Sequence, residues 1–129
     1  YKDALIYIAE QFELTPKIVK LVNEKFYHLD TCFQKLPTKN NDAIFYPQAF
    51  EDTSLNEFSD LFNLMPVSEN DANKLACNSV VINQSVIFPS EDIDIIETVA
   101  DLGCNIEISD VSEFLKSGGA CQCLVITLQ

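Results

Sequence analysis

The sequence has little of what marks a chain without a globular core. Only three glycines and five prolines occur among its 129 residues, whereas 47% of the residues are hydrophobic and 22% are charged. This composition excludes a fibrous chain and an intrinsically disordered one. The length is sufficient for one ordinary domain that buries a hydrophobic core.

Long apolar runs are missing as well. No stretch approaches the roughly 20 apolar residues that a transmembrane helix requires. No basic segment leads into an apolar segment, which is the pattern of a secretory signal. We therefore predict no contact with membranes and a cytoplasmic location. The chain begins with Tyr1 inside a predicted helix, and this favours a fragment or a processed piece.

Positive charge is scarce. Eight Lys and Arg residues stand against twenty Asp and Glu residues, so the formal net charge is −12. So few cations cannot follow a phosphate backbone, and nucleic acid is therefore excluded as a partner. The negative charge is compatible with a small cationic substrate, although most of these carboxylates are expected to be solvated surface groups.

Cysteine occurs an odd number of times, at positions 32, 77, 104, 121 and 123. An odd count without a secretory signal favours reduced thiols in the cytosol over a disulfide framework. Cys77 and Cys104 lie among apolar neighbours, and we expect both to be inert core residues.

The spacing of apolar residues predicts a mixed α/β chain. Helices are predicted at 2–12, at 54–60, from Ser68 onward, at 90–102 with an end at Gly103, and at 111–116. Strands are predicted at 17–23, 26–33, 43–46, 61–67, 78–82, 85–88, 104–108 and 120–128, with 78–82 and 85–88 forming a hairpin.

The predicted elements repeat. The order strand, strand, helix, strand, short helix occurs twice, with a period of about 50 residues that is typical of repeated supersecondary units. We therefore predict repeats at roughly 27–76 and 77–129, preceded by a leading piece. Two units cannot close a ring, so in a propeller further blades would be missing on the N-terminal side.

The single histidine, His28, is followed two residues later by Asp30. A strand over 26–33 would place both side chains on one face, because side chains alternate along a strand. An imidazole can move protons near neutral pH, while a carboxylate binds or orients a cation. A partly buried histidine tied to a nearby aspartate for structural reasons is the alternative, and the residues alone leave both open.

Two glycines, Gly118 and Gly119, precede Cys121 and Cys123. Glycines allow the backbone to turn tightly or to approach a ligand closely. A thiol at this place can be a nucleophile if its pKa is lowered, and the predicted strand puts both thiols on one face. A C-x-C metal half-site and plain strand cysteines are alternatives. A metal needs three or four ligands, and the sequence offers only His28 and one carboxylate to complete such a half-site.

These segments resemble guanidine-modifying enzymes of the pentein superfamily. His28 and Asp30 fall in a string similar to the H-x-D motif of arginine deiminases and amidinotransferases. Residues 117–124 resemble the Gly-Gly-x-x-x-Cys nucleophile segment of the family. Residues 26–33 and 47–50 are similar to bacterial relatives of dimethylarginine dimethylaminohydrolase. The resemblance covers nearly the whole chain, with its motifs in the family's order.

The resemblance implies a fold and a set of site residues. The fold is a partial α/β propeller of ββαβ-type repeats, about two and a half blades of a five-blade pentein propeller. Residues 1–129 would form the C-terminal portion of a single catalytic domain. Cys123 would be the nucleophile, His28 the acid and base, and Asp30 a ligand of the guanidinium. No metal and no organic cofactor are implied.

The implied reaction is hydrolysis of a guanidino substrate through a thiouronium on Cys123. Transfer of the amidino group to an acceptor amine would instead make an amidinotransferase, and a non-catalytic propeller binding protein is the third alternative. Relatives also hold the guanidinium with an acidic, Gly-rich segment of the N-terminal blades, which nothing here matches. We therefore predict that the 129 residues do not turn over substrate alone, and that a homodimer or missing N-terminal blades complete the site.

Overall fold

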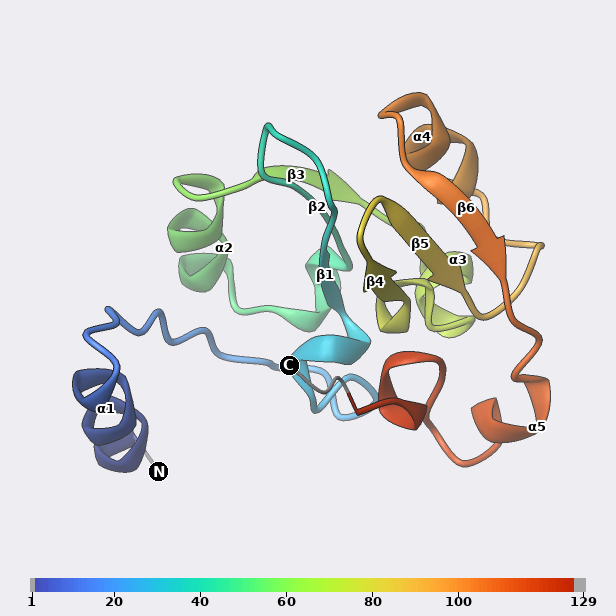
Figure 1. Cartoon of the computed structure of the whole chain (residues 1–129). Helices are drawn as coiled ribbons and strands as arrows, with labels where there is room; N and C mark the ends of the chain where they lie inside the picture. Colours follow the sequence, from blue (N-terminus) through green and yellow to red (C-terminus); the bar gives the residue numbers. More distant parts are fainter. Residues whose placement is uncertain (1, 127–129) are drawn as a thin grey trace.

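Two small sheets form the body of the chain in a computed structural model, which describes residues 2–126 (Figure 1). The first sheet has the order β1-β2-β3 and the second the order β4-β5-β6. In each sheet the first two strands are antiparallel and the third strand is parallel to the second. The strands are β1 (Phe33–Lys35), β2 (Asp42–Phe45), β3 (Asn63–Pro66), β4 (Val80–Ile82), β5 (Ser85–Phe88) and β6 (Asn105–Ile108).

Helices occupy matching places in the two units. A helix joins the second strand to the third in each sheet, α2 before β3 and α4 before β6. The α-helices are α1 (Lys2–Gln11), α2 (Asp52–Ser59), α3 (Glu69–Asn73), α4 (Ile95–Asp101) and α5 (Ser112–Leu115), and the short 3-10 turns are η1 (Leu29–Thr31), η2 (Pro47–Ala49), η3 (Ala76–Asn78) and η4 (Gln122–Leu124). The predicted α/β class with repeated ββαβ units is confirmed.

One hydrophobic core joins the two sheets. Strand β2 is buried at all four of its positions, as a central strand requires. Around the first sheet the core is aromatic, and the ring of Phe33 stacks on that of Phe58 with centroids 4.7 Å apart. Around the second sheet it is mostly aliphatic, with Val86 and Val99 fully buried. Helix α1 lies apart from both sheets (Figure 1).

Several local signals in the sequence act as predicted. Ser68 precedes α3, and its hydroxyl accepts the N–H of Asp71 at 3.0 Å, which caps the helix. Gly103 follows α4 with φ of 86°, a left-handed conformation that favours glycine. The predicted hairpin forms β4 and β5, and Asn83 in its turn has φ of 53°. None of the helices described over residues 2–126 is long and apolar enough to cross a membrane.

The predicted strand over 17–23 is wrong. Its backbone forms a single isolated β-bridge, between Leu21 and Phe50, instead of a strand ladder. The reason is that the neighbouring segment around Phe50 offers little extended backbone with which a strand could pair. That neighbour runs between η2, which ends at Ala49, and α2, which begins at Asp52.

The predicted strand over 26–33 is also wrong. The N–H of Thr31 donates to the carbonyl of His28 and the N–H of Cys32 to that of Leu29, both at 3.1 Å. These bonds close the 3-10 turn η1, and they turn the chain before β1 can begin. The alternation of apolar residues predicted a strand here, because that pattern carries no information about local backbone hydrogen bonds.

The predicted strand over 120–128 is replaced by a turn within the described residues. The N–H of Leu124 donates to the carbonyl of Cys121 at 3.1 Å, which forms η4. Residues 127 and 128 of the predicted strand lie outside the described residues.

The predicted helix over 90–102 begins later, at Ile95. Its first free N–H groups are held by a distant side chain rather than by the local polar residues. The carboxylate of Asp71 accepts the N–H of Asp94 at 2.9 Å and that of Ile95 at 3.1 Å. Asp71 lies in α3, which follows the first sheet, and α4 lies between two strands of the second, so the helix start depends on packing between distant segments.

Candidate functional site

Two 3-10 turns meet where the units adjoin. Turn η1 precedes β1, turn η3 precedes β4, and the two turns contact each other. The C-terminal turn η4 reaches the same place, because the thiol Sγ of Cys123 lies 3.6 Å from the carboxylate Oδ2 of Asp30. These residues are 93 positions apart in the sequence, and the tertiary structure brings them together.

Asp30 takes its orientation from η1. The carbonyl of His28 accepts the N–H of Thr31 at 3.1 Å and its hydroxyl at 2.6 Å, which fixes the start of the turn. His28 lies in extended backbone directly before the turn, whereas Asp30 lies within it, so the alternation of side chains along a strand does not relate the two. The expectation that His28 and Asp30 share one face of a strand is therefore wrong. Asp30 is half-buried and His28 is exposed.

His28 packs against its neighbour rather than against the thiol. Its ring meets the ring of Tyr27 edge-on, with centroids 4.4 Å apart. Among the described residues, no hydrogen bond joins the His28 ring to Asp30 or Cys123. The role of His28 as acid and base stays a prediction.

The five cysteines, all in the described part of the chain, divide sharply by exposure: Cys123 is exposed and the other four are buried. Burial, together with the negative charge of Asp30, raises the pKa of Cys32 to about 12. Burial also raises the pKa values of Cys77, Cys104 and Cys121. Because the thiolate is the nucleophilic form, burial disfavours nucleophilic reaction at these four thiols.

Cys121 and Cys123 were expected on one face of a strand, and this is wrong. The turn η4 directs Cys121 into the core and Cys123 to the surface. The preceding glycines act as predicted. Gly118 has φ of 82°, and a Cβ on Gly119 would lie 3.2 Å from the Cβ of Cys123, so a larger residue would crowd the exposed cysteine.

Asn78 is the residue at this site whose role the sequence analysis missed. It lies at the end of η3 and is fully buried. Its amide nitrogen donates to Asp30, and its amide oxygen accepts backbone N–H groups of the segment that carries Cys123. A polar amide inside the apolar run around Cys77 is the signal that could have revealed it.

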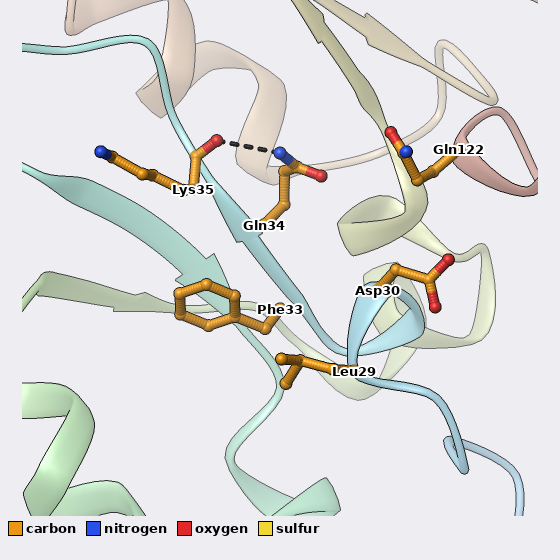
Figure 2. A pocket seen from close by; sticks show the side chains of 6 residues that line it. All are labelled: Leu29, Asp30, Phe33, Gln34, Lys35 and Gln122. Carbon is orange, nitrogen blue, oxygen red and sulfur yellow. Dashed lines mark hydrogen bonds between the residues drawn. The ribbon is translucent and has the colours of Figure 1, made fainter. Parts of the chain in front are cut away.

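An open pocket of about 360 Å³ lies beside these groups. Figure 2 shows Asp30 on the turn before β1 and Gln122 on the separate C-terminal segment. The lining residues are Leu29, Asp30, Phe33, Gln34, Lys35 and Gln122. The lining is mixed, because it combines the Asp30 carboxylate and the Lys35 amine with two glutamine amides and two apolar side chains. Within it, Asp30 is the group that can pair with the charge of an organic cation.

No family model matches the chain. The chain is 34% identical over 129 residues to the bifunctional arginine dihydrolase/ornithine cyclodeaminase ArgZ of Synechocystis, a match that covers 96% of this chain and 18% of ArgZ. The solved N-terminal domain of ArgZ aligns with a TM-score of 0.86 at 33% identity, over 96% of this chain and 46% of that one. The chain is a pentein homologue. The predicted resemblance to guanidine-modifying enzymes is confirmed.

A second pentein enzyme supports the same relationship. The chain is 32% identical over 120 residues to the N(G),N(G)-dimethylarginine dimethylaminohydrolase of Pseudomonas aeruginosa, covering 93% of this chain and 43% of that protein. The solved structure of that enzyme aligns with a TM-score of 0.74 at 30% identity, over 92% of this chain and 42% of that one. An uncharacterised Caenorhabditis elegans protein is 42% identical over 113 residues, with coverage of 84% and 39%.

The chain spans between 18% and 43% of the length of the curated relatives that it matches. Its characterised homologues include an arginine dihydrolase and a dimethylarginine dimethylaminohydrolase, and the match covers part of each. Across residues 2–126, no group of three or more His, Cys, Asp or Glu side chains gathers in a way that could hold a metal ion. The chemical groups that do come together are the Cys123 thiol, the Asp30 carboxylate and the Asn78 amide.

Proposed function

We propose that this chain carries the nucleophile of an enzyme that hydrolyses a guanidino group, with Cys123 as nucleophile, His28 as acid and base, and Asp30 as a ligand of the substrate. The observation that carries the proposal is the exposed Cys123 thiol, 3.6 Å from the Asp30 carboxylate. The substrate class is arginine, a methylated arginine or a related guanidine. The relatives support this class, since they include an arginine dihydrolase and a dimethylarginine dimethylaminohydrolase.

Asp30 would hold the substrate cation beside the sulfur. A carboxylate pairs with two N–H groups of a planar guanidinium, and this fixes the plane of the substrate. Placing the positive substrate next to Cys123 also favours the thiolate, because an opposite charge nearby stabilises the ionised form. Binding and activation of the nucleophile would thus be coupled.

The reaction would proceed in two halves. The Cys123 thiolate attacks the guanidinium carbon and a C–S bond forms, which gives a tetrahedral adduct. His28 donates a proton to the departing amine as its C–N bond breaks, and a thiouronium remains on Cys123. His28 then takes a proton from water, whose oxygen bonds to the carbon while the C–S bond breaks. The remaining hydroxyl proton passes to solvent, a ureido product leaves, and the thiolate is regenerated.

Solved relatives support a covalent route. One form of the ArgZ N-terminal domain is covalently bound to a reaction intermediate, and a Cys-to-Ser mutant of the same domain is bound to substrate. A Cys-to-Ser mutant of the Pseudomonas aeruginosa dimethylarginine dimethylaminohydrolase is complexed with citrulline. These structures are of relatives, and we propose the same covalent route for Cys123.

Groups from outside this chain would complete the pocket. The pocket beside Asp30 is open, and Asp30 is its one lining carboxylate within residues 2–126. We propose that a second copy or N-terminal blades supply further guanidinium ligands, so the 129 residues alone do not catalyse. We also propose a cytoplasmic location, which the five free thiols support. Turnover by the 129 residues at rates normal for an enzyme would contradict the first statement, and secretion of the native-length protein would contradict the second.

Labelling with a haloacetamidine, a small reactive mimic of the guanidinium, tests the proposal. We expect modification of Cys123 in the native-length protein, protection by arginine-like ligands, and loss of the preference over neutral iodoacetamide in Asp30→Ala. Cys121→Ser is the matched control and should label like the wild type, because Cys121 is buried. Equal labelling by both reagents, without ligand protection, would favour the alternative of a non-catalytic binding protein.

A product assay separates the two enzymatic alternatives. Release of ammonia or an alkylamine with formation of a ureido product, in the absence of an acceptor amine, indicates hydrolysis. Turnover that requires an added acceptor amine indicates an amidinotransferase. Cys123→Ser should abolish either activity, with a loss of at least about a thousandfold, because the residual rate then comes from binding alone.

A further inference from the structure

The Asn78 amide is shared between the two segments of the candidate site. Its nitrogen Nδ2 donates to the backbone carbonyl of Asp30 at 3.0 Å and to the carboxylate Oδ2 of Asp30 at 3.2 Å. Its oxygen Oδ1 accepts the N–H of Ala120 at 2.9 Å and, at a longer 3.4 Å, the N–H of Cys123. One buried side chain therefore bonds to the turn that bears the carboxylate and to the turn that bears the thiol.

We propose that Asn78 is a positioning residue, which holds the Cys123 thiol and the Asp30 carboxylate at their working separation. The inference rests on the proposed function, since it assigns Asn78 a task within that site. The amide is suited to it because it carries two donors on one atom and two acceptor positions on the other. An aspartate of the same shape would keep the acceptor half alone, and a leucine would keep neither.

Complete pairing of the buried amide supports this role. Asn78 is fully buried, and a buried polar group without hydrogen-bond partners is destabilising. Both donors and both acceptor positions of Asn78 are used, so no part of the amide is left unpaired. A buried network in which every member is paired holds its partners in one arrangement.

The backbone before Asn78 is strained in a way that serves the same placement. Leu75 has φ of 56° and ψ of 42°, a left-handed conformation that is unfavourable for a leucine. The carbonyl of Leu75 accepts the N–H of Asn78 at 2.9 Å, so this residue starts the turn that carries the amide. Surrounding packing must hold such a conformation in place, and Leu75 is itself buried.

The amide also selects which carboxylate oxygen faces the sulfur. Oδ2 of Asp30 receives the Asn78 bond and lies 3.6 Å from Sγ of Cys123. Among the described residues, no hydrogen bond engages Oδ1 of Asp30, so this oxygen is available to a bound cation. By holding the rotation of the carboxylate, Asn78 would keep one oxygen toward the thiol and the other toward the substrate.

Two variants of Asn78, with a matched neighbour as control, test the inference in the native-length protein. Asn78→Asp keeps the oxygen that accepts from Ala120 and Cys123, but it replaces the donor with an anion facing Asp30. Asn78→Ala removes both halves. Ser79→Ala changes an equally buried neighbour whose hydroxyl has no hydrogen-bond partner among the described residues, so it controls for a change in the core.

The readout is the pH profile of Cys123 alkylation by chloroacetamidine and by neutral iodoacetamide. For Asn78→Asp we expect the midpoint with iodoacetamide to rise by about one pH unit, because the new anion adds to Asp30, the charged side chain that contacts the thiol. For Asn78→Ala we expect the chloroacetamidine preference to fall at least about tenfold, as misplacement by about 1 Å does to reactive groups. Ser79→Ala should stay within about twofold of the wild type.

Each outcome decides something. If both Asn78 variants behave like Ser79→Ala with both reagents, the positioning role is overturned. If the wild type shows no chloroacetamidine preference while Asn78→Asp still shifts the iodoacetamide midpoint, the positioning role stands and the proposed function fails. If Asn78→Ala does not fold, Asn78→Asp decides alone, because it occupies the same volume.

Discussion

The two units use the same backbone device for opposite purposes. In each, a 3-10 turn ends two residues before the first strand, so Thr31 at the end of η1 and Asn78 at the end of η3 hold equivalent places. Turn η1 displays a half-buried Asp30 and follows an exposed His28, whereas η3 is buried at all three positions. Burial makes the difference: η1 leaves Asp30 partly accessible, whereas η3 is buried and its Asn78 bonds to Asp30 and to the segment that carries Cys123.

The contrast extends to the cysteines. Cys77 in η3 is buried and its pKa is well above the ordinary value, chiefly because burial disfavours the charged thiolate. Cys123, which η3 supports through Asn78, is exposed. The same residue type is thus a buried core group at one turn and a candidate nucleophile next to it.

The largest expected effect comes from a substitution directly before η1, which should lower the activity and leave the stability almost unchanged. His28→Ala should lower turnover by about 10²- to 10⁴-fold, the range for losing a general acid and base. The free energy of unfolding of the His28→Ala variant should differ from that of the wild type by less than about 0.5 kcal/mol, because His28 is exposed. Steady-state kinetics and urea unfolding measure the two quantities, and Tyr27→Phe, which keeps the ring contact, should match the wild type. Turnover within a few-fold of the wild type would refute the assignment of His28.

An intermediate effect tests whether the start of α4 depends on a distant segment. Asp71→Ala should lower the free energy of unfolding by about 1–2 kcal/mol, because Asp71 in α3 caps α4. Asp94→Ala is the control, since Asp94 precedes α4 but its side chain makes no capping bond, and it should change stability by less than about 0.5 kcal/mol. Urea unfolding measures both. Equal losses would show that the cap from α3 adds nothing.

The smallest effect concerns the buried thiols and appears at alkaline pH. Cys32 has a pKa of about 12 in the fold against a reference value of 9.0, because burial and Asp30 disfavour the thiolate. Below pH 9 the thiol is protonated whether the chain is folded or not, so its contribution to stability is fully present. Between 9 and 12 the unfolded thiol ionises while the folded one does not, and stability falls. The urea midpoint of the wild type should therefore be lower at pH 10 than at pH 8. We expect a smaller drop for Cys32→Ala and the same drop as the wild type for Cys123→Ser.

Local sequence signals fixed much of the fold without help from distant residues. The cap at Ser68, the helix end at Gly103 and the tight turn at Asn83 all depend on neighbouring backbone, and all three act as predicted. The glycines before Cys123 belong to the same group. Such signals are readable because the interactions that they describe close within a few residues.

The site itself lay in longer interactions. The sequence alone determined the repeated ββαβ pattern, the family resemblance and the candidates His28, Asp30 and Cys123. Only the tertiary structure decided that Asp30 and Cys123 meet across 93 positions, and that Asn78 bridges to Ala120 across 42. The physical reason is that burial and long-range hydrogen bonds set the direction of these side chains, and neither is encoded in the spacing of neighbouring residues.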